Sequence, residues 1–478
     1  MPFYPIVPET SCDGPQKAGW NPGRRNHEKG WFSMKRRTSL ALRIGALLLA
    51  AAMLAGCGDT GTASDDAPVP ESSGPQERTV TWDNTFWVAA SIGLGAINTE
   101  AQVKRVVQNH SEAGVNMILW YTEESQFSSL FLEECAKHGI YTILMDNGSI
   151  SGASENWQPI TEEEFKQKIT PYLDNPQVVG FINWDEPFHE DQYYTMMKER
   201  QDWTHKYAPG MLSFINLVPS YGPYTWGNGQ WKEHVDTLIE RVQPDVLSVD
   251  YYEFGLNGRD ADLDTSFLWR DLGYLRMKAI ETDTPLWFYF QGTDHTGENG
   301  GDLTVPQLEF QMNAGLAYGS RWLCYWTSEG SVIDERGFKV KNADEIAALN
   351  ARVKTVGSYL LDKEPGELYH AGLAKTEETN KRLAEQFYCD DVADSAVFAG
   401  LPSSHVILST FTDDTDRTYV VAVNRHCTEA VSDTVQLLDS YAVSALDVNT
   451  GEETPVSDAA QTLSLELAPG ALQLFILE

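Results

Sequence analysis

Eight apolar segments alternate with amphipathic helical segments between Phe86 and Ser328. Segments this continuously apolar are typical of strands buried on both faces. Eight strand–helix repeats predict a closed (β/α)8 TIM barrel, whereas an open doubly wound sheet usually has fewer strands. No glycine-rich phosphate loop follows the first segment, which also favours the barrel. We expect strands at 86–94, 115–122, 140–147, 178–186, 211–219, 244–254, 285–292 and 320–328.

The hydrophobic period changes to two after a closing helix at 342–361. Apolar and polar residues alternate in short segments separated by turn residues such as Asp413-Asp414 and Asn449-Thr450-Gly451. This pattern predicts a small antiparallel β-sandwich with strands at 406–412, 418–424, 434–438, 462–467 and 471–477. We therefore assign 81–364 to the barrel and 365–478 to the sandwich.

The N-terminal region has the features of an export signal. Met34 offers a second start, followed by the basic run Lys35-Arg36-Arg37 and an apolar run at 44–55 that is too short for an ordinary membrane span. The run ends Leu54-Ala55-Gly56-Cys57, which resembles the bacterial lipobox. That resemblance implies lipidation of Cys57 and a protein anchored on the extracytoplasmic face of the cell membrane. Residues 1–33 are then an upstream start-site extension, 34–57 the signal peptide and 58–80 a flexible tether.

The charge balance and the missing motifs exclude several function classes. With 35 basic and 69 acidic residues the net charge is −34, which disfavours nucleic acid but not neutral sugars. The sequence has no His-Glu-x-x-His and no Gly-x-Ser-x-Gly motif. Asp260, Asp262 and Asp264 alternate as in a calcium loop, but Thr265 replaces the required Gly. We expect no cofactor and no metal.

Cysteine spacing gives little further information. The cysteines after Cys57 are not spaced as metal ligands. Cys389 and Cys427 could pair in an oxidising compartment, or both could be free thiols.

The fourth apolar segment carries the strongest chemical signal. It ends Asn183-Trp184-Asp185-Glu186-Pro187, and Pro187 ends the strand because it has no N–H to donate. In a β/α barrel, side chains from separate strands converge at this end around a ligand. A sheltered carboxyl group there is a candidate proton donor. The alternative is that Glu186 only caps the following helix.

At these residues the chain resembles the clan A glycoside hydrolases. These are retaining (β/α)8 enzymes whose general acid/base is a Glu at the end of the fourth strand, often in Asn-Glu or Asp-Glu followed by Pro. The resemblance covers roughly 86–365, and a trailing sandwich is common in the group. It implies that Glu186 is the acid/base. Trp184, two residues earlier on the same face of the strand, could supply an apolar wall.

The resemblance fails at the second carboxylate. Clan A places a nucleophilic Glu at the end of the seventh strand, where this chain has Gln291. An amide cannot form a glycosyl ester. The nucleophile could come from another strand, with Glu329 as first candidate and Asp250 as second. Alternatively the enzyme inverts with a more distant base, or the barrel binds sugar without cleaving it.

Aromatic and amide side chains are concentrated at the expected C-terminal strand ends. Flat rings suit the apolar faces of sugars, and amides suit their hydroxyls. The residues that we expect to bind substrate are Asp185, Asn183, Trp120, Tyr121, Asn216, Tyr252, Gln291 and Trp326.

The preferred function is an extracytoplasmic glycoside hydrolase that cleaves O-glycosidic bonds of oligo- or polysaccharides. The first alternative is a catalytically inactive, glycan-binding surface lipoprotein. The second is the solute-binding subunit of an importer, although such proteins have two lobes around a hinge rather than eight similar repeats.

Overall fold

The computed structural model describes residues 78–92, 97–120, 126–145, 150–151, 159–222, 228–254, 263–264, 266–293, 303–374, 377–415 and 417–478. The predictions for the extension, the signal peptide, Cys57 and most of the tether therefore lie outside the described residues, as does the prediction for Tyr121. In the described ranges, no helix has both the length and the apolar character needed to cross a membrane.

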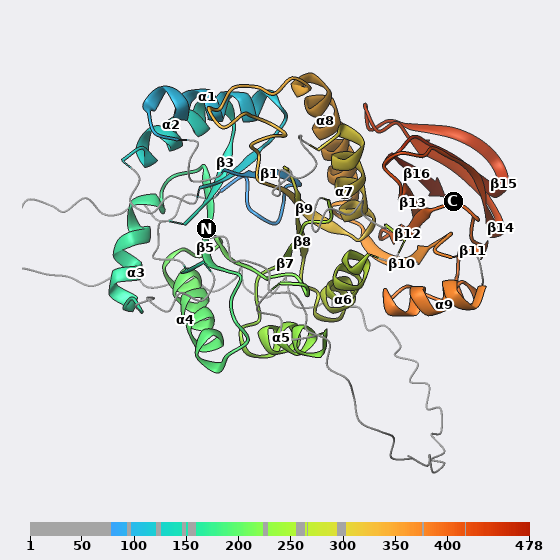
Figure 1. Cartoon of the computed structure of the whole chain (residues 1–478), viewed down its shortest axis with the longest axis horizontal. Helices are drawn as coiled ribbons and strands as arrows, with labels where there is room; N and C mark the ends of the chain where they lie inside the picture. The colour runs from blue at the N-terminus through green and yellow to red at the C-terminus, as the bar shows by residue number, and fades with distance from the viewer. Residues whose placement is uncertain are drawn as a thin grey trace, which may run out of the picture. The chain divides into compact units, whose positions relative to one another are not determined.

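Eight parallel strands form the predicted barrel (Figure 1). β1 pairs with both β2 and β9, and a parallel bridge between Leu217 and Val249 closes the ring between β6 and β7. The fold class is thus confirmed, and the closed ring excludes the two-lobed importer subunit. The barrel strands are β1 (Trp87–Ser91), β2 (Met117–Trp120), β3 (Tyr141–Leu144), β5 (Val178–Asp185), β6 (Leu212–Asn216), β7 (Leu247–Tyr251), β8 (Leu286–Gln291) and β9 (Ser320–Trp326). A short strand, β4 (Ile150–Ser151), pairs with the end of β5.

Helices lie around the barrel strands (Figure 1). Local sequence determines several of their starts: Thr99 caps the first helix, and Thr161 forms a reciprocal capping box with Glu164 at the third. The helices are α1 (Glu100–Glu112), α2 (Ser128–His138), α3 (Glu162–Ile169), α4 (Asp191–Tyr207), α5 (Asn228–Arg241), α6 (Phe267–Thr282), α7 (Val305–Ala317) and α8 (Ala343–Leu360).

Alternate strand residues build two separate cores. Inward-facing side chains fill the barrel, including Trp87, Leu119, Phe214, Trp287 and Trp322. Outward-facing side chains pack between the strands and the helices. This arrangement explains why the strands are apolar on both faces, since each face meets a packed layer.

The N-terminal end of the barrel is covered by the first described segment. Arg78 donates hydrogen bonds to the carbonyls of Leu173 and Val178, at 2.6 and 2.7 Å. Trp82 packs edge-on against Trp287 inside the barrel, with ring centroids 6.2 Å apart. The opposite, C-terminal end of the strands is where a ligand site is expected.

The C-terminal strands form a separate antiparallel sheet with its own core, as predicted. β14 and β15 are much longer than expected, because exposed polar residues interrupt their apolar pattern. In the described residues Cys135, Cys324, Cys389 and Cys427 are all free thiols. The elements are β10 (Glu364–His370), α9 (Glu377–Gln386), β11 (Phe398–Gly400), β12 (Val406–Thr412), β13 (Thr418–Asn424), β14 (Val431–Leu446), β15 (Glu453–Leu467) and β16 (Leu472–Leu477).

Candidate active site

Two carboxylates and an amide point into the barrel at the C-terminal ends of three adjacent strands. Asp185 ends β5, Asn216 ends β6, and Asp250 lies near the end of β7. The amide nitrogen of Asn216 donates to Oδ1 of Asp185 at 3.2 Å and to Oδ1 of Asp250 at 3.1 Å. The Ser248 hydroxyl donates to the side-chain amide oxygen Oδ1 of Asn216 at 2.8 Å, which orients the amide. Asn216 therefore holds two buried acids on one side of the barrel mouth.

A β-bulge at Asn183 gives Asp185 its inward direction. Ile182 pairs with Phe214 and Trp184 pairs with Ile215, so β5 advances two residues while β6 advances one. A bulge shifts the alternation of side chains by one residue. Trp184 consequently lies in the outer core, edge-on to Tyr193 of α4 at 5.4 Å. The prediction that Trp184 forms a wall beside Glu186 is wrong.

Glu186 reaches the same acidic cluster through an unusual backbone conformation. Its φ of 52° lies in the left-handed region, which costs a non-glycine residue on the order of 1–3 kcal/mol. Its N–H donates to the carbonyl of Asn216 at 2.9 Å. Successive residues of a regular strand face opposite sides, whereas this turn lets Asp185 and Glu186 both approach Asp250.

The surroundings favour the protonated form of Glu186. Burial is the main cause that raises the pKa of Glu186, and the charges of Asp250 and Asp185 raise it further. The Glu186 side chain also hydrogen-bonds Asp250, which requires one of the two carboxyl groups to carry a proton.

Asp250 is better able to carry the negative charge. Burial and the charge of Asp185 raise the pKa of Asp250, but hydrogen bonds from Tyr252 and Asn216 oppose that rise. At Glu186, by contrast, burial, both neighbouring charges and the hydrogen bond with Asp250 all raise the pKa. These directions favour the shared proton on Glu186, with Asp250 as the acceptor of its hydrogen bond.

Two tyrosines border the three acids. The backbone N–H of Tyr252 donates to the hydroxyl of Tyr221 at 3.1 Å, and the Tyr252 side chain hydrogen-bonds Asp250. Tyr221 packs edge-on against Tyr251 at 4.9 Å, yet 40% of the residue is exposed. Burial of the hydroxyl and the charge of Asp250 raise the pKa of Tyr221, so it stays neutral. Tyr221 thus offers an exposed aromatic surface next to buried acids.

A chain of polar side chains lies behind the turn at Glu186. His189 hydrogen-bonds the hydroxyl of Tyr194 at 2.6 Å, and the same hydroxyl contacts Nδ1 of His234. The His234 imidazole also faces the backbone of Pro187. Burial lowers the pKa of His234 to about 4, which keeps its ring neutral. This chain joins α4 to α5 close to Pro187, the residue that follows Glu186.

Several predicted site residues lie elsewhere. Trp120 stacks on Phe131 in the outer core at 4.1 Å. Asn183 points away from the mouth and donates to the hydroxyls of Thr204 and Ser213, at 2.9 and 2.7 Å.

Gln291 has a structural contact at the position where a nucleophile was expected. Its amide oxygen accepts from the N–H of Phe254 at 2.7 Å, and its amide nitrogen donates to the carbonyls of Phe254 and Thr293 at 2.7 and 3.0 Å. The residue is 1% exposed. The side chain therefore fixes the segment after β7 to the end of β8.

The residues predicted on or after β9 have different surroundings. Trp326 packs against the barrel interior at the end of the strand. Glu329 lies in the following turn, where its backbone pairs with Ile333. The acids that act most strongly on Glu186 are Asp250 and Asp185. The structure thus brings together Glu186, Asp250, Asp185, Asn216 and Tyr252 from the predicted set, and adds Tyr221, Tyr194 and His234.

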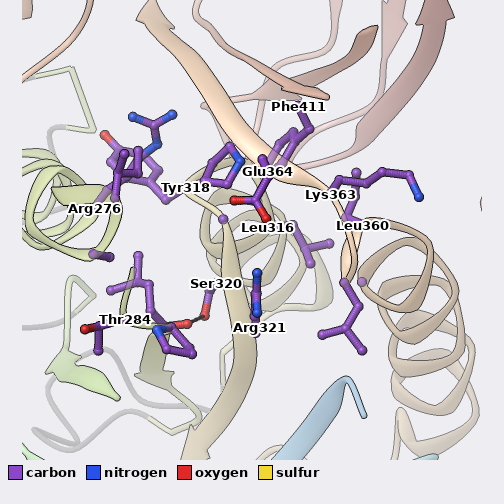
Figure 2. Close-up of a pocket in the computed structure, with 18 of the residues that line it drawn as sticks. Arg276, Thr284, Leu316, Tyr318, Ser320, Arg321, Leu360, Lys363, Glu364 and Phe411 are labelled. Atoms are coloured by element: carbon purple, nitrogen blue, oxygen red, sulfur yellow. Dashed lines mark hydrogen bonds between the residues drawn. The ribbon is translucent and has the colours of Figure 1, made fainter. Parts of the chain in front are cut away.

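A cavity lies at the other end of the barrel (Figure 2). Leu286 and Ser320, which begin β8 and β9, line it together with Phe411 from β12. Its charged lining is mixed, with Arg276 and Arg321 alongside Glu364. The cavity lies at the N-terminal ends of the strands, so it is separate from the acidic cluster at their C-terminal ends.

Comparisons with known proteins give a likeness of fold. No family profile matches the chain, and no curated protein sequence is significantly similar to it. A β-L-arabinopyranosidase from Geobacillus stearothermophilus is 12% identical with a TM-score of 0.47, covering 83% of this chain and 97% of that one. An endo-1,4-β-mannanase from Rhizomucor miehei is 12% identical with a TM-score of 0.38, covering 56% and 97%. An endo-β-1,4-mannanase from Thermotoga petrophila is 12% identical with a TM-score of 0.39, covering 83% and 92%. At these sequence identities and TM-scores, the function of the similar protein cannot be assigned to this chain.

Proposed function

We propose that this protein is a glycoside hydrolase in which Glu186 is the general acid. The observation that carries the proposal is the partly buried carboxyl of Glu186, which is hydrogen-bonded to Asp250 at the C-terminal mouth of a β/α barrel and whose pKa is raised there. Catalysis requires an acid that still holds its proton when it meets the glycosidic oxygen. Burial and two neighbouring acids supply that condition.

In the proposed reaction Glu186 donates its proton to the glycosidic oxygen as the bond to the anomeric carbon breaks. Water finally supplies a hydroxyl group to that carbon, and its remaining proton returns to a carboxylate of the cluster. The transition state has oxocarbenium character. The negative charge shared by Asp250 and Asp185 stabilises this developing positive charge. Tyr221 supplies an aromatic face for a sugar ring.

We assign the second carboxylate to Asp250 rather than to Glu329. Asp250 is 3% exposed, receives hydrogen bonds from Asn216 and Tyr252, and contacts Glu186 directly. Substrate must displace the Glu186–Asp250 hydrogen bond to reach both groups. Carboxyl groups about 5–5.5 Å apart in the occupied site correspond to retention of configuration, and about 6.5–9.5 Å to inversion.

The test is to incubate the protein with a panel of oligosaccharides and polysaccharides and to measure turnover as the release of reducing ends. Glu186→Gln and Asp250→Asn should each lower kcat by about 10²–10⁴-fold while the folded state is retained. Glu190→Gln is the matched control, because Glu190 is an exposed acid in the same strand–helix connection. Unchanged turnover in Glu186→Gln would remove Glu186 from the mechanism.

Gln291 favours a second candidate, a glycan-binding protein without hydrolytic activity. Its amide occupies the position of the expected nucleophile and is committed to main-chain contacts. Calorimetric binding of an oligosaccharide with no reducing ends released over days would establish this alternative. Detectable hydrolysis that depends on Glu186 would exclude it.

We also propose that the mature protein is a lipoprotein anchored through Cys57 on the extracytoplasmic face. The support is the Leu54-Ala55-Gly56-Cys57 sequence after a basic and apolar signal. Incorporation of labelled fatty acid should be lost in Cys57→Ala, and the protein should leave the membrane fraction. Equal labelling of both forms would refute lipidation at Cys57.

A further inference from the structure

The structure places two histidines and an aspartate together at the contact between the barrel and the antiparallel sheet. Asp264 lies between β7 and α6, whereas His405 precedes β12 and His426 follows β13. Val406 pairs with Asn424, so the two histidines lie at the same end of a strand pair. Their rings are 4.0 Å apart between centroids.

One nitrogen of each imidazole points at the same carboxylate oxygen. His405 Nδ1 lies 3.0 Å and His426 Nε2 lies 3.4 Å from Asp264 Oδ1. One ligand atom from each of the three residues lies within 4.8 Å of the others. Ligands about 2.0–2.1 Å from a tetrahedral ion are about 3.3 Å apart. The separations therefore suit a single ion between the three side chains.

Hydrogen bonding alone does not account for this packing. Asp264 Oδ1 also faces Arg425 Nη2 at 2.8 Å and Nε at 3.2 Å, so four nitrogens converge on one oxygen. A carboxylate offers about four lone-pair sites over both of its oxygens. Four nitrogens around a single oxygen exceed the two lone pairs of that oxygen. At least one imidazole nitrogen is then better used as a lone-pair donor to a cation.

Arg425 is compatible with such an ion as an outer partner. Its side chain is buried and also donates to the carbonyl of Ala371 at 2.9 Å. Ligating carboxylates are commonly hydrogen-bonded from outside, which fixes their orientation. The positive charge of Arg425 beside Asp264 would lower the affinity for a cation.

We propose that Asp264, His405 and His426 bind a divalent transition ion of the Zn²⁺ type, with water completing its coordination. Two imidazoles and one carboxylate suit such an ion, whereas Ca²⁺ and Mg²⁺ prefer oxygen ligands alone. The ion would join the antiparallel sheet to the segment between β7 and α6.

The test uses the full-length protein stripped of metal. Calorimetry measures its titration with Zn²⁺, and visible absorption measures its titration with Co²⁺. We expect one ion per chain, a Co²⁺ ligand-field spectrum and a rise in Tm with Zn²⁺. His405→Ala and His426→Ala should each weaken Zn²⁺ affinity at least tenfold. His205→Ala should leave it unchanged, since His205 contacts Asp245 at 3.0 Å on a different surface.

These measurements separate the metal site from the proposed hydrolase activity. Glu186→Gln should bind the ion as the wild type does, because Glu186 is not a ligand. Failure of the wild type to bind Zn²⁺ at millimolar concentration would overturn the proposal. Equal affinity in wild type, His405→Ala and His426→Ala would also overturn it, even if the protein hydrolyses glycans.

Discussion

The amide nitrogen of Asn216 lies 3.1 Å from the carboxylate of Asp250 and donates to it inside the barrel mouth. A hydrogen bond to a buried carboxylate stabilises its charged form. This contact favours the anion of Asp250, whereas burial and the charge of Asp185 act against it and raise the pKa of Asp250 to about 7.

Asn216→Ala should move the acid limb of the pH–activity profile to higher pH. The substitution removes a donor to charged Asp250, which is worth about 1.5–3 kcal/mol, or about one to two pH units. The measurement is kcat/KM against pH. Asn183→Ala is the control, because Asn183 is also a buried amide but bonds Thr204 and Ser213 outside the mouth. Asn183→Ala should lower the stability of the protein and leave the pH–activity profile unchanged. An equal shift of the acid limb in both variants would contradict the role of Asn216 as a hydrogen-bond donor to charged Asp250.

Glu186→Gln should stabilise the protein at alkaline pH. The pKa of Glu186 is raised in the folded state, so the native chain binds more protons than the unfolded chain above the ordinary carboxyl pKa. The free energy of unfolding then falls as pH rises, by at most about 1.4 kcal/mol per pH unit. The variant has an uncharged amide at this position, so its free energy of unfolding does not fall with pH for this reason.

Urea unfolding of the two forms at pH 4 and pH 8 measures the difference. The two should be close at pH 4, where the wild-type carboxyl is protonated in both states. The variant should be the more stable form at pH 8. The opposite result would be a wild type that becomes more stable relative to the variant as the pH rises from 4 to 8. It would show that the Glu186 carboxyl is ionised in the folded protein.

Sequence periodicity predicted the barrel and the acidic strand end, but not the direction of each side chain. Eight apolar repeats are a global signal that survives errors at any one position. The bulge at Asn183 depends on how β5 pairs with β6, and it reverses the faces of Trp184 and Asp185. The strict period-two pattern therefore placed Trp184 on the wrong side. The left-handed backbone of Glu186 has no sequence signal beyond the following proline.

The spacing of residues along the sequence also could not predict contacts between distant segments. The sequence around Asp264 indicates only a local calcium-like loop. His405 and His426 lie more than one hundred residues away along the chain and meet Asp264 only after β12 and β13 pair. The clan A pattern predicts a nucleophilic Glu at the position of Gln291. It carries no information about the hydrogen bonds between the Gln291 side chain and Phe254.

Gln291→Glu should destabilise the protein without creating activity. The new carboxylate would lose the donors to Phe254 and Thr293 and would face their carbonyl oxygens instead. An unsatisfied buried polar group costs about 1–3 kcal/mol, and a charged one more. Gln291→Met removes all three hydrogen bonds without adding charge. Thermal unfolding should rank wild type above Gln291→Met, and Gln291→Met above Gln291→Glu at neutral pH. Raised turnover in Gln291→Glu would reveal a nucleophile position after all.

Tyr194→Phe should lower kcat while leaving KM nearly unchanged. The Tyr194 hydroxyl links His189 to His234, and His234 faces the backbone of Pro187, next to the strained Glu186. Without the hydroxyl the turn is held less firmly, and small displacements of an acid cost rate more than binding. We expect kcat to fall about tenfold. Tyr193→Phe is the matched control, because the ring of Tyr193 packs on Trp184 and Phe188. Equal losses in both variants, or a loss confined to KM, would mean that the hydroxyl of Tyr194 does not position Glu186.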